Sequence, residues 1–220
     1  MKKYLKIIFI SLLVILAVSF YKIYLPKKNT ASEKSFDKTI ELKDGDLIFQ
    51  TSLSNQSKAI QLATKSKYSH CGIIYKEGND YVVFEAIQTV RKTSLEKWIK
   101  RGQNGHYVVK RLKNANDVLS PQILNEMKLI GKGFNGKSYD LYFEWSDEKI
   151  YCSELIWKIY KRAAGIEIGK LETLKAFDLS NKIVQQKMKE RYGETINLDE
   201  LVISPAQMFN SDLLTTVKSN

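Results

Sequence analysis

The chain has 220 residues, of which 44% are hydrophobic and 27% are charged, a globular mixture that excludes wholesale disorder and collagen-like repeats. The net charge is +11, but six lysines and no acidic residue lie within the first 28 positions. The remaining 29 basic and 24 acidic residues give a net charge of only +5 with both signs interspersed, which does not indicate nucleic-acid binding.

The N-terminal segment is predicted to enter the membrane. Residues 7–21 read IIFISLLVILAVSFY without a charge, and the apolar run continues to Leu25 with Lys22 as its interruption. Nineteen helical residues span about 28 Å, close to the hydrocarbon thickness of a bilayer. We interpret residues 1–25 as an anchor, with a signal peptide cleaved after Ser19 as the alternative. The short basic N-terminal flank favours a membrane-anchored or exported domain outside the cytoplasm.

Residues 26–40 are polar and predict a tether, and residues 41–220 have the size of one domain. The segments 70–75 and 81–87 are rich in β-branched and aromatic residues and flank KEGND, which predicts a β-hairpin. Further strands are expected at 46–50, 106–112 and 201–203. Helices are expected at 55–65, from the capping-box pattern of 93–96 to Gly102, from Ser120-Pro121 to Gly131, at 152–165 and at 178–192. Strands that form hairpins indicate an α+β fold, with an antiparallel sheet packed with helices.

Cys152 is the candidate nucleophile. It begins the predicted helix CSELIWKIYKRAAG, where unpaired backbone N–H groups and the helix dipole favour a thiolate. The same N–H groups can stabilise an oxyanion. A cysteine nucleophile also needs a base and a group that orients the base.

The base is predicted to be His70, at the start of the hairpin. Folding the hairpin through KEGND places His70 opposite residue 85, 86 or 87, and symmetric closure pairs it directly with Glu85. Because neighbouring side chains on one face of a sheet lie about 4.5–5.5 Å apart, Glu85 can orient the imidazole. The chain's other histidine, His106, has no such carboxylate partner by spacing. Cys71 adjoins His70 on the strand, so its side chain points to the opposite face and is expected to be a core residue.

These residues resemble a known family. YSHCGIIY, the Glu85 hairpin and YCSELIWKIY, with DGDLIFQ and VISPAQM, are similar to the YiiX/YebB-like branch of the NlpC-type cysteine hydrolases, over residues 42–214. The resemblance implies a circularly permuted papain-like fold. It also implies Cys152 as nucleophile, His70 as base and Glu85 as the orienting group of a triad, in the permuted chain order.

The resemblance implies amide chemistry, possibly on cell-wall peptides, through a thioester intermediate. An acyltransferase or lipid hydrolase with the same triad is the alternative, and a non-catalytic binding module is a third hypothesis. The expected substrate is a peptide or an acyl amide, and Tyr68, Ser69 and Tyr151 are candidates for contacting it. Neither a CxxC motif nor a Cys/His cluster occurs, so we expect no metal and no cofactor.

Overall fold

The computed structural model describes residues 41–220, which form one compact unit. The predicted anchor (1–25) and tether (26–40) lie outside the described residues. Between residues 41 and 220, no helix is both long and apolar enough to cross a bilayer.

The centre of the domain is a six-stranded sheet in the order β4-β3-β2-β1-β5-β8, in which every neighbouring pair is antiparallel. Its strands are β1 (Leu47–Gln50), β2 (His70–Glu77), β3 (Asp80–Ala86), β4 (Val90–Ser94), β5 (Val108–Leu112) and β8 (Leu214–Ser219). The short strands β6 (Glu172–Thr173) and β7 (Leu201–Val202) form a separate pair. The predicted α+β class and antiparallel sheet are confirmed.

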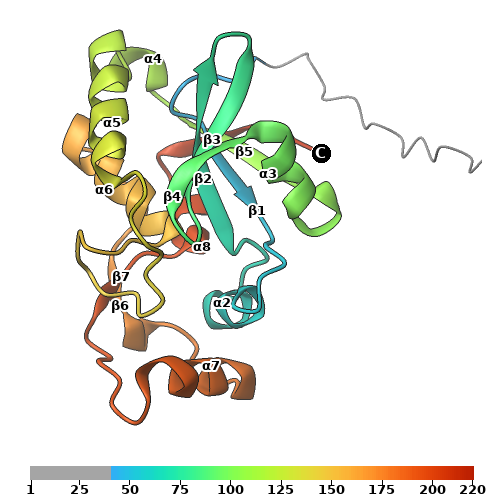
Figure 1. The fold of residues 1–220 in the computed structure, drawn as a ribbon, viewed down its shortest axis with the longest axis vertical. Coiled ribbons are helices and arrows are strands. Elements are labelled where there is room, and N and C mark those ends of the chain that lie inside the picture. Colours follow the sequence, from blue (N-terminus) through green and yellow to red (C-terminus); the bar gives the residue numbers. More distant parts are fainter. Residues whose placement is uncertain (1–40) are drawn as a thin grey trace, which may run out of the picture. The chain divides into compact units, whose positions relative to one another are not determined.

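Helices cover both faces of this sheet. They are α2 (Ser57–Thr64), α3 (Leu95–Arg101), α4 (Ala115–Val118), α5 (Pro121–Phe134), α6 (Cys152–Ala164), α7 (Lys182–Tyr192) and α8 (Pro205–Phe209), with 3-10 turns at Gln103–Gly105 and Leu174–Ala176. Figure 1 shows α5 and α6 side by side on one face and α3 on the other, while α2 and α7 lie at one end of the domain.

Strand alternation divides the core between the two faces. Cys71 and Ile73 of β2 point toward α5 and α6 and share a buried cluster with Leu155. Ile74 lies on the opposite face, in a second buried cluster with Trp98 of α3. Successive residues of β2 therefore contact different layers of the protein.

The largest differences from the predicted elements involve long-range packing. The strands β4 and β8 and the helix α8 were not anticipated from the sequence. The helix α5 does not end at Gly131 as predicted but continues to Phe134. A Cβ at Gly131 would lie 3.0 Å from the Phe84 ring, so this glycine allows α5 to approach β3 closely rather than terminating the helix.

The capping box predicted at 93–96 is wrong. Thr93 and Ser94 end strand β4, and α3 begins at Leu95 without a side-chain cap from Ser94. The Thr93 hydroxyl instead donates a hydrogen bond to Glu85 Oε1 at 2.6 Å. Thr93, which the local pattern assigns to a helix terminus, is thus a strand residue that donates a hydrogen bond to the neighbouring strand β3.

Candidate active site

Cys152 is the first residue of α6. Tyr151 before it is extended, and Gly165 ends the helix in the left-handed conformation with φ of 70°. The Glu154 carboxylate accepts a hydrogen bond from the Tyr151 backbone N–H at 3.3 Å, which holds the start of the helix. The Cys152 side chain is therefore fixed where a helix presents unpaired N–H groups, in the interior of the domain.

His70 and Glu85 meet, although the direct pairing expected from symmetric closure is wrong. β2 and β3 pair with Ile73 opposite Phe84, and this register extends to place residue 87 opposite His70, one of the three alternatives. The shift of two residues keeps Glu85 on the same face as His70. The two side chains contact each other diagonally, with His70 Nε2 2.6 Å from Glu85 Oε2.

Gly72 lies beside this diagonal contact and allows close packing of β2 on β3. In the extended register it lies opposite Glu85, on the same face as His70. A Cβ at Gly72 would lie 2.4 Å from Val83 Cγ1 and 3.5 Å from Glu85 Cβ. The missing side chain therefore avoids a clash with Val83 and a tight contact with the Phe84 backbone oxygen, 3.0 Å from the same Cβ position.

The Glu85 carboxylate is buried and has three side-chain partners. His70 and Arg101 Nη2 contact Oε2, and Thr93 donates to Oε1. Trp98 also restricts the orientation of His70, because its ring stacks on the His70 ring with centroids 5.8 Å apart. The imidazole is held between a carboxylate at its edge and an indole on its face.

This arrangement favours an ion pair between His70 and Cys152. Burial alone would lower the pKa of His70, but hydrogen bonds to Cys152 and Glu85 raise it to about 9. Burial would raise the pKa of Glu85, but hydrogen bonds from His70 and Thr93 and the charge of Arg101 lower it to about 2. Because Nε2 faces Glu85, Nδ1 is the nitrogen left for the thiol.

The Cys152 thiol has a pKa well below its ordinary value. A hydrogen bond from the Cys71 side chain is the largest cause, and a hydrogen bond and the positive charge of His70 act in the same direction against the cost of burial. Cys71 is a buried residue, as predicted, and both cysteines are free thiols. That Cys71 shares a buried cluster with Cys152 was not anticipated from the sequence.

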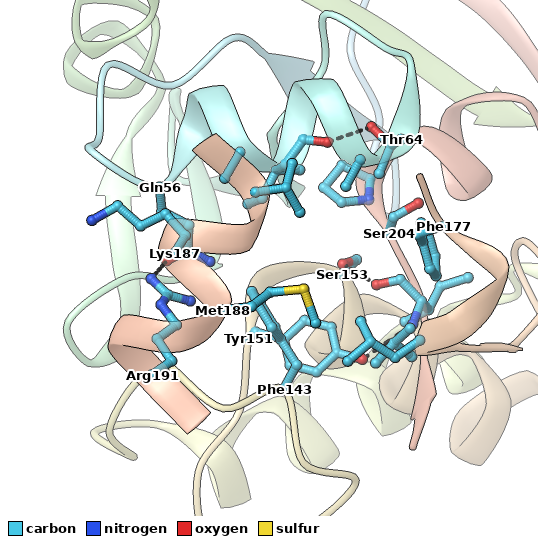
Figure 2. Close-up of a pocket in the computed structure, with 18 of the residues that line it drawn as sticks. Gln56, Thr64, Phe143, Tyr151, Ser153, Phe177, Lys187, Met188, Arg191 and Ser204 are labelled. Carbon is cyan, nitrogen blue, oxygen red and sulfur yellow. Dashed lines mark hydrogen bonds between the residues drawn. The ribbon is translucent and has the colours of Figure 1, made fainter. Parts of the chain in front are cut away.

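A pocket opens beside Cys152. Its cavity volume is about 110 Å³, and it is open to solvent. Its walls come from α2, α7, the 139–151 segment and the residues around Ile203, and they are almost entirely apolar. Figure 2 places Gln56, Lys187 and Arg191 together at one end and Phe177 and Ser204 at the other.

The three candidates for substrate contact are placed differently. Tyr151 lines the pocket, and its hydroxyl accepts a hydrogen bond from the Ile203 backbone N–H at 3.1 Å. Tyr68 stacks on Phe209 with ring centroids 4.0 Å apart and lies in the core rather than in the pocket wall. Ser69 bonds Ser57 Oγ at 2.6 Å and joins β2 to α2.

The polar contacts of His106 involve residues other than Cys152, His70 and Glu85. Its Nδ1 contacts the backbone oxygen of Asn220 at 2.7 Å, and its Nε2 lies 3.3 Å from Lys67 Nζ. Within residues 41–220, no three His, Cys, Asp or Glu side chains are grouped in a way that could hold a metal ion.

Sequence reasoning missed Thr93, Arg101 and Trp98, which position the His70–Glu85 pair. Thr93 lies on the unanticipated strand β4, and the other two lie on α3. The spacing of Trp98 and Arg101 could have indicated one helix face, because residues three apart in a helix are neighbours. Only the packing of α3 on the sheet shows that this face meets Glu85.

Comparison with known proteins identifies the same family that the sequence motifs resemble. The family model described as "Permuted papain-like amidase enzyme, YaeF/YiiX, C92 family" matches residues 41–218. The "Uncharacterized protein YiiX" of Escherichia coli (strain K12) is 47% identical over 173 residues, which are 79% of this chain and 84% of that protein.

A solved structure agrees with this match. It is described as "Crystal structure of metalloprotein yiiX from Escherichia coli O157:H7, DUF1105", and it superposes with a TM-score of 0.77 at 47% identity. The alignment covers 81% of this chain and 97% of that chain.

Proposed function

The chain belongs to the C92 family of permuted papain-like amidases, and we propose that it hydrolyses amide bonds with Cys152, His70 and Glu85 as a catalytic triad. Membership of the family supports a cysteine-hydrolase activity and implies an amide substrate. The observation that carries the proposal is the buried contact of 2.6 Å between His70 Nε2 and Glu85 Oε2, and the raised pKa of His70, to which Cys152 at the N-terminus of α6 contributes, supports it.

In the first half-reaction, the Cys152 thiolate attacks the carbonyl carbon of the amide. The negative charge that develops on the carbonyl oxygen faces backbone N–H groups at the start of α6. The His70 imidazolium then donates its Nδ1 proton to the departing amine, and a thioester on Cys152 remains. Glu85 stabilises the imidazolium and fixes its orientation.

In the second half-reaction, neutral His70 removes a proton from water, which attacks the thioester. The acid product leaves, and the thiolate–imidazolium pair is restored. His70 thus alternates between acid and base. The pKa of His70, about 9, means that it enters the first half-reaction protonated at neutral pH.

The apolar pocket favours a second candidate function, that of an acyltransferase or lipid hydrolase with the same triad. Cys152 lies in a wall otherwise formed by side chains such as Val184, Met188 and Phe177. Such a wall suits a hydrocarbon chain, because each buried CH₂ group contributes about 0.8 kcal/mol. The cations of Lys187 and Arg191 at one end suit an acidic head group.

Whole-protein mass measurement tests both functions. We expect incubation with peptidoglycan peptides or acyl lipids to add the mass of the donor's acyl group to Cys152, and the adduct identifies the donor class. Met188→Glu, in the pocket wall, is expected to slow acylation by long-chain donors about tenfold or more, the contribution of two buried CH₂ groups.

Ile183→Glu is the matched control. It makes the same substitution on α7 at a residue that is 43% exposed and outside the pocket lining, so acylation should be preserved. Equal effects of the two substitutions would exclude the pocket as the acyl site. Acylation by peptide donors alone would favour the amidase over the lipid enzyme.

We also propose that residues 7–25 hold the protein at the membrane with residues 41–220 outside the cytoplasm. The uncharged run from Ile7 to Tyr21 supports this. Full-length chain expressed in a bacterium should pellet with membranes and resist high-salt extraction, and protease added to spheroplasts should digest the domain. A chain that starts at residue 41 should remain in the supernatant. Soluble mature protein that starts at Phe20 would instead establish a cleaved signal peptide.

A further inference from the structure

Phe143 has a backbone conformation that a bulky side chain rarely adopts. Its φ is 55°, in the left-handed region that favours glycine. Among residues 41–220, two other non-glycine residues have a positive φ. Lys65 is the C-terminal cap of α2, where this conformation is common, and Asn104 is of a residue type that tolerates it. Neither reason applies to Phe143, so contacts with the surrounding structure must hold it there.

Helix α7 holds the turn that contains Phe143. Arg191 Nη1 donates a hydrogen bond to the Leu141 backbone oxygen at 2.9 Å, and the Tyr192 hydroxyl donates one to the Tyr142 backbone oxygen. Both residues that precede Phe143 are therefore bonded to the C-terminal end of α7. These two bonds restrain the chain where it enters the left-handed conformation.

The Phe143 ring has two partners of its own. It meets the Tyr151 ring edge to face, with centroids 5.1 Å apart, and Arg191 Cζ lies 5.5 Å from its centroid. Arg191 is also fixed at the start of α2, because its Nη2 donates a hydrogen bond to Gln56 Oε1 at 2.7 Å. Arg191 thus restrains both the backbone of the turn and the ring of Phe143.

The Phe143 ring forms part of the wall of the pocket that Cys152 lines. Tyr151, which the ring contacts, directly precedes Cys152 in the chain, and Figure 2 shows Phe143 next to Tyr151 in this wall. The cavity, of about 110 Å³, is smaller than a cavity of about 150 Å³ that holds benzene. It therefore encloses only a short stretch of an acyl chain, and the ring occupies space that a longer stretch would need.

We propose that Phe143 is a specificity-determining residue: its ring, held by Arg191 and Tyr151, limits how much of the acyl group of a substrate is enclosed beside Cys152. The inference rests on the proposed function, since it requires that Cys152 accepts an acyl group. A turn with this φ is formed without strain by glycine, so an aromatic residue in its place indicates a use for the ring.

The test measures acylation of Cys152 by p-nitrophenyl acetate, butyrate, octanoate and laurate. The Cys152 sulfur bonds to the acyl carbon and p-nitrophenolate leaves, so nitrophenolate release gives the rate and whole-protein mass identifies the adduct. We expect the wild-type rate to rise with chain length and to level off once the enclosed length is filled. Phe143→Ala removes the ring, so the ratio of the octanoate rate to the acetate rate should increase about tenfold or more, the contribution of two further buried CH₂ groups.

Tyr142→Ala is the matched control, because it removes the neighbouring aromatic ring, which is 41% exposed and outside the pocket lining. Its octanoate-to-acetate ratio should equal that of the wild type. Phe143→Gly should increase the ratio as much as Phe143→Ala does. It should also unfold at a higher temperature than Phe143→Ala, because glycine adopts the positive φ without strain.

An unchanged ratio in both Phe143 variants, with acetate still transferred to Cys152, would overturn the role of Phe143 and leave the nucleophile intact. An equal increase in Tyr142→Ala would overturn it too, because the effect would then belong to the turn and not to the ring in the pocket. Absence of an adduct on Cys152 with all four esters would instead refute the proposed function, and with it the acyl site that Phe143 would limit.

Discussion

Cys152→Ala is expected to abolish turnover and the covalent adduct. The substitution removes the atom that forms the thioester, while the oxyanion site and the pocket remain. Loss of a nucleophile in a triad lowers turnover by at least about 10³-fold, because the remaining members cannot act without it. The measurement is hydrolysis of any donor found to acylate the wild type, together with whole-protein mass.

The thermal unfolding midpoint of Cys152→Ala serves as the folding control, since the removed side chain is buried in the core. An adduct on the Cys152→Ala protein would assign the nucleophile to another residue. Turnover without a mass adduct in the wild type would exclude a stable thioester and would favour direct attack by water.

The second large effect is the difference in turnover expected between His70→Ala and His106→Ala. His70→Ala removes the base and acid and should lower kcat by about 10²–10⁴-fold or more. His106→Ala, matched in chemistry, removes an imidazole whose contacts are with Asn220 and Lys67. Changes of surface residues usually shift free energies by no more than about 0.5 kcal/mol, so turnover should stay within about twofold.

Glu85→Gln separates the role of the carboxylate from that of the ring. It keeps an acceptor for His70 but loses the charge that helps to hold the pKa of His70 near 9. We expect more activity than in His70→Ala, with the loss mainly in kcat and with the alkaline limb of the pH profile moved to lower pH. An active His70→Ala beside an inactive His106→Ala would refute the assignment of His70.

Some features followed directly from local patterns. The apolar periodicity after Cys152 and the terminating Gly165 predicted that Cys152 lies at a helix N-terminus, as observed. The two β-rich runs around KEGND predicted the hairpin, and the structure has β2 and β3 there. YSHCGI and YCSEL together indicated the family, which the comparisons confirm.

The local sequence pattern did not fix the pairing register of the hairpin, because the register depends on the length and position of the loop. Glu77 of β2 pairs with Asp80 of β3, so the turn is centred at position 78.5, one residue later than the predicted closure about 77.5, and each residue of β2 pairs with a residue two positions further along β3. Since side chains alternate with a period of two, the shift by two residues preserved the contact between His70 and Glu85. A shift by one residue would have separated them.

By itself, the sequence determined which local element carries each candidate catalytic residue: Cys152 at the start of a helix, and His70 and Glu85 on one face of a hairpin. Only the tertiary structure decided their surroundings. Packing of α3 brings Arg101 to Glu85, and packing of α6 on β2 places Cys71 and Cys152 in one buried cluster. The physical reason is the difference in sequence separation between local and tertiary contacts. Helix and strand periods act over a few residues, whereas the contacts that tune the thiol join segments about 80 residues apart, and only side-chain packing between the layers fixes them.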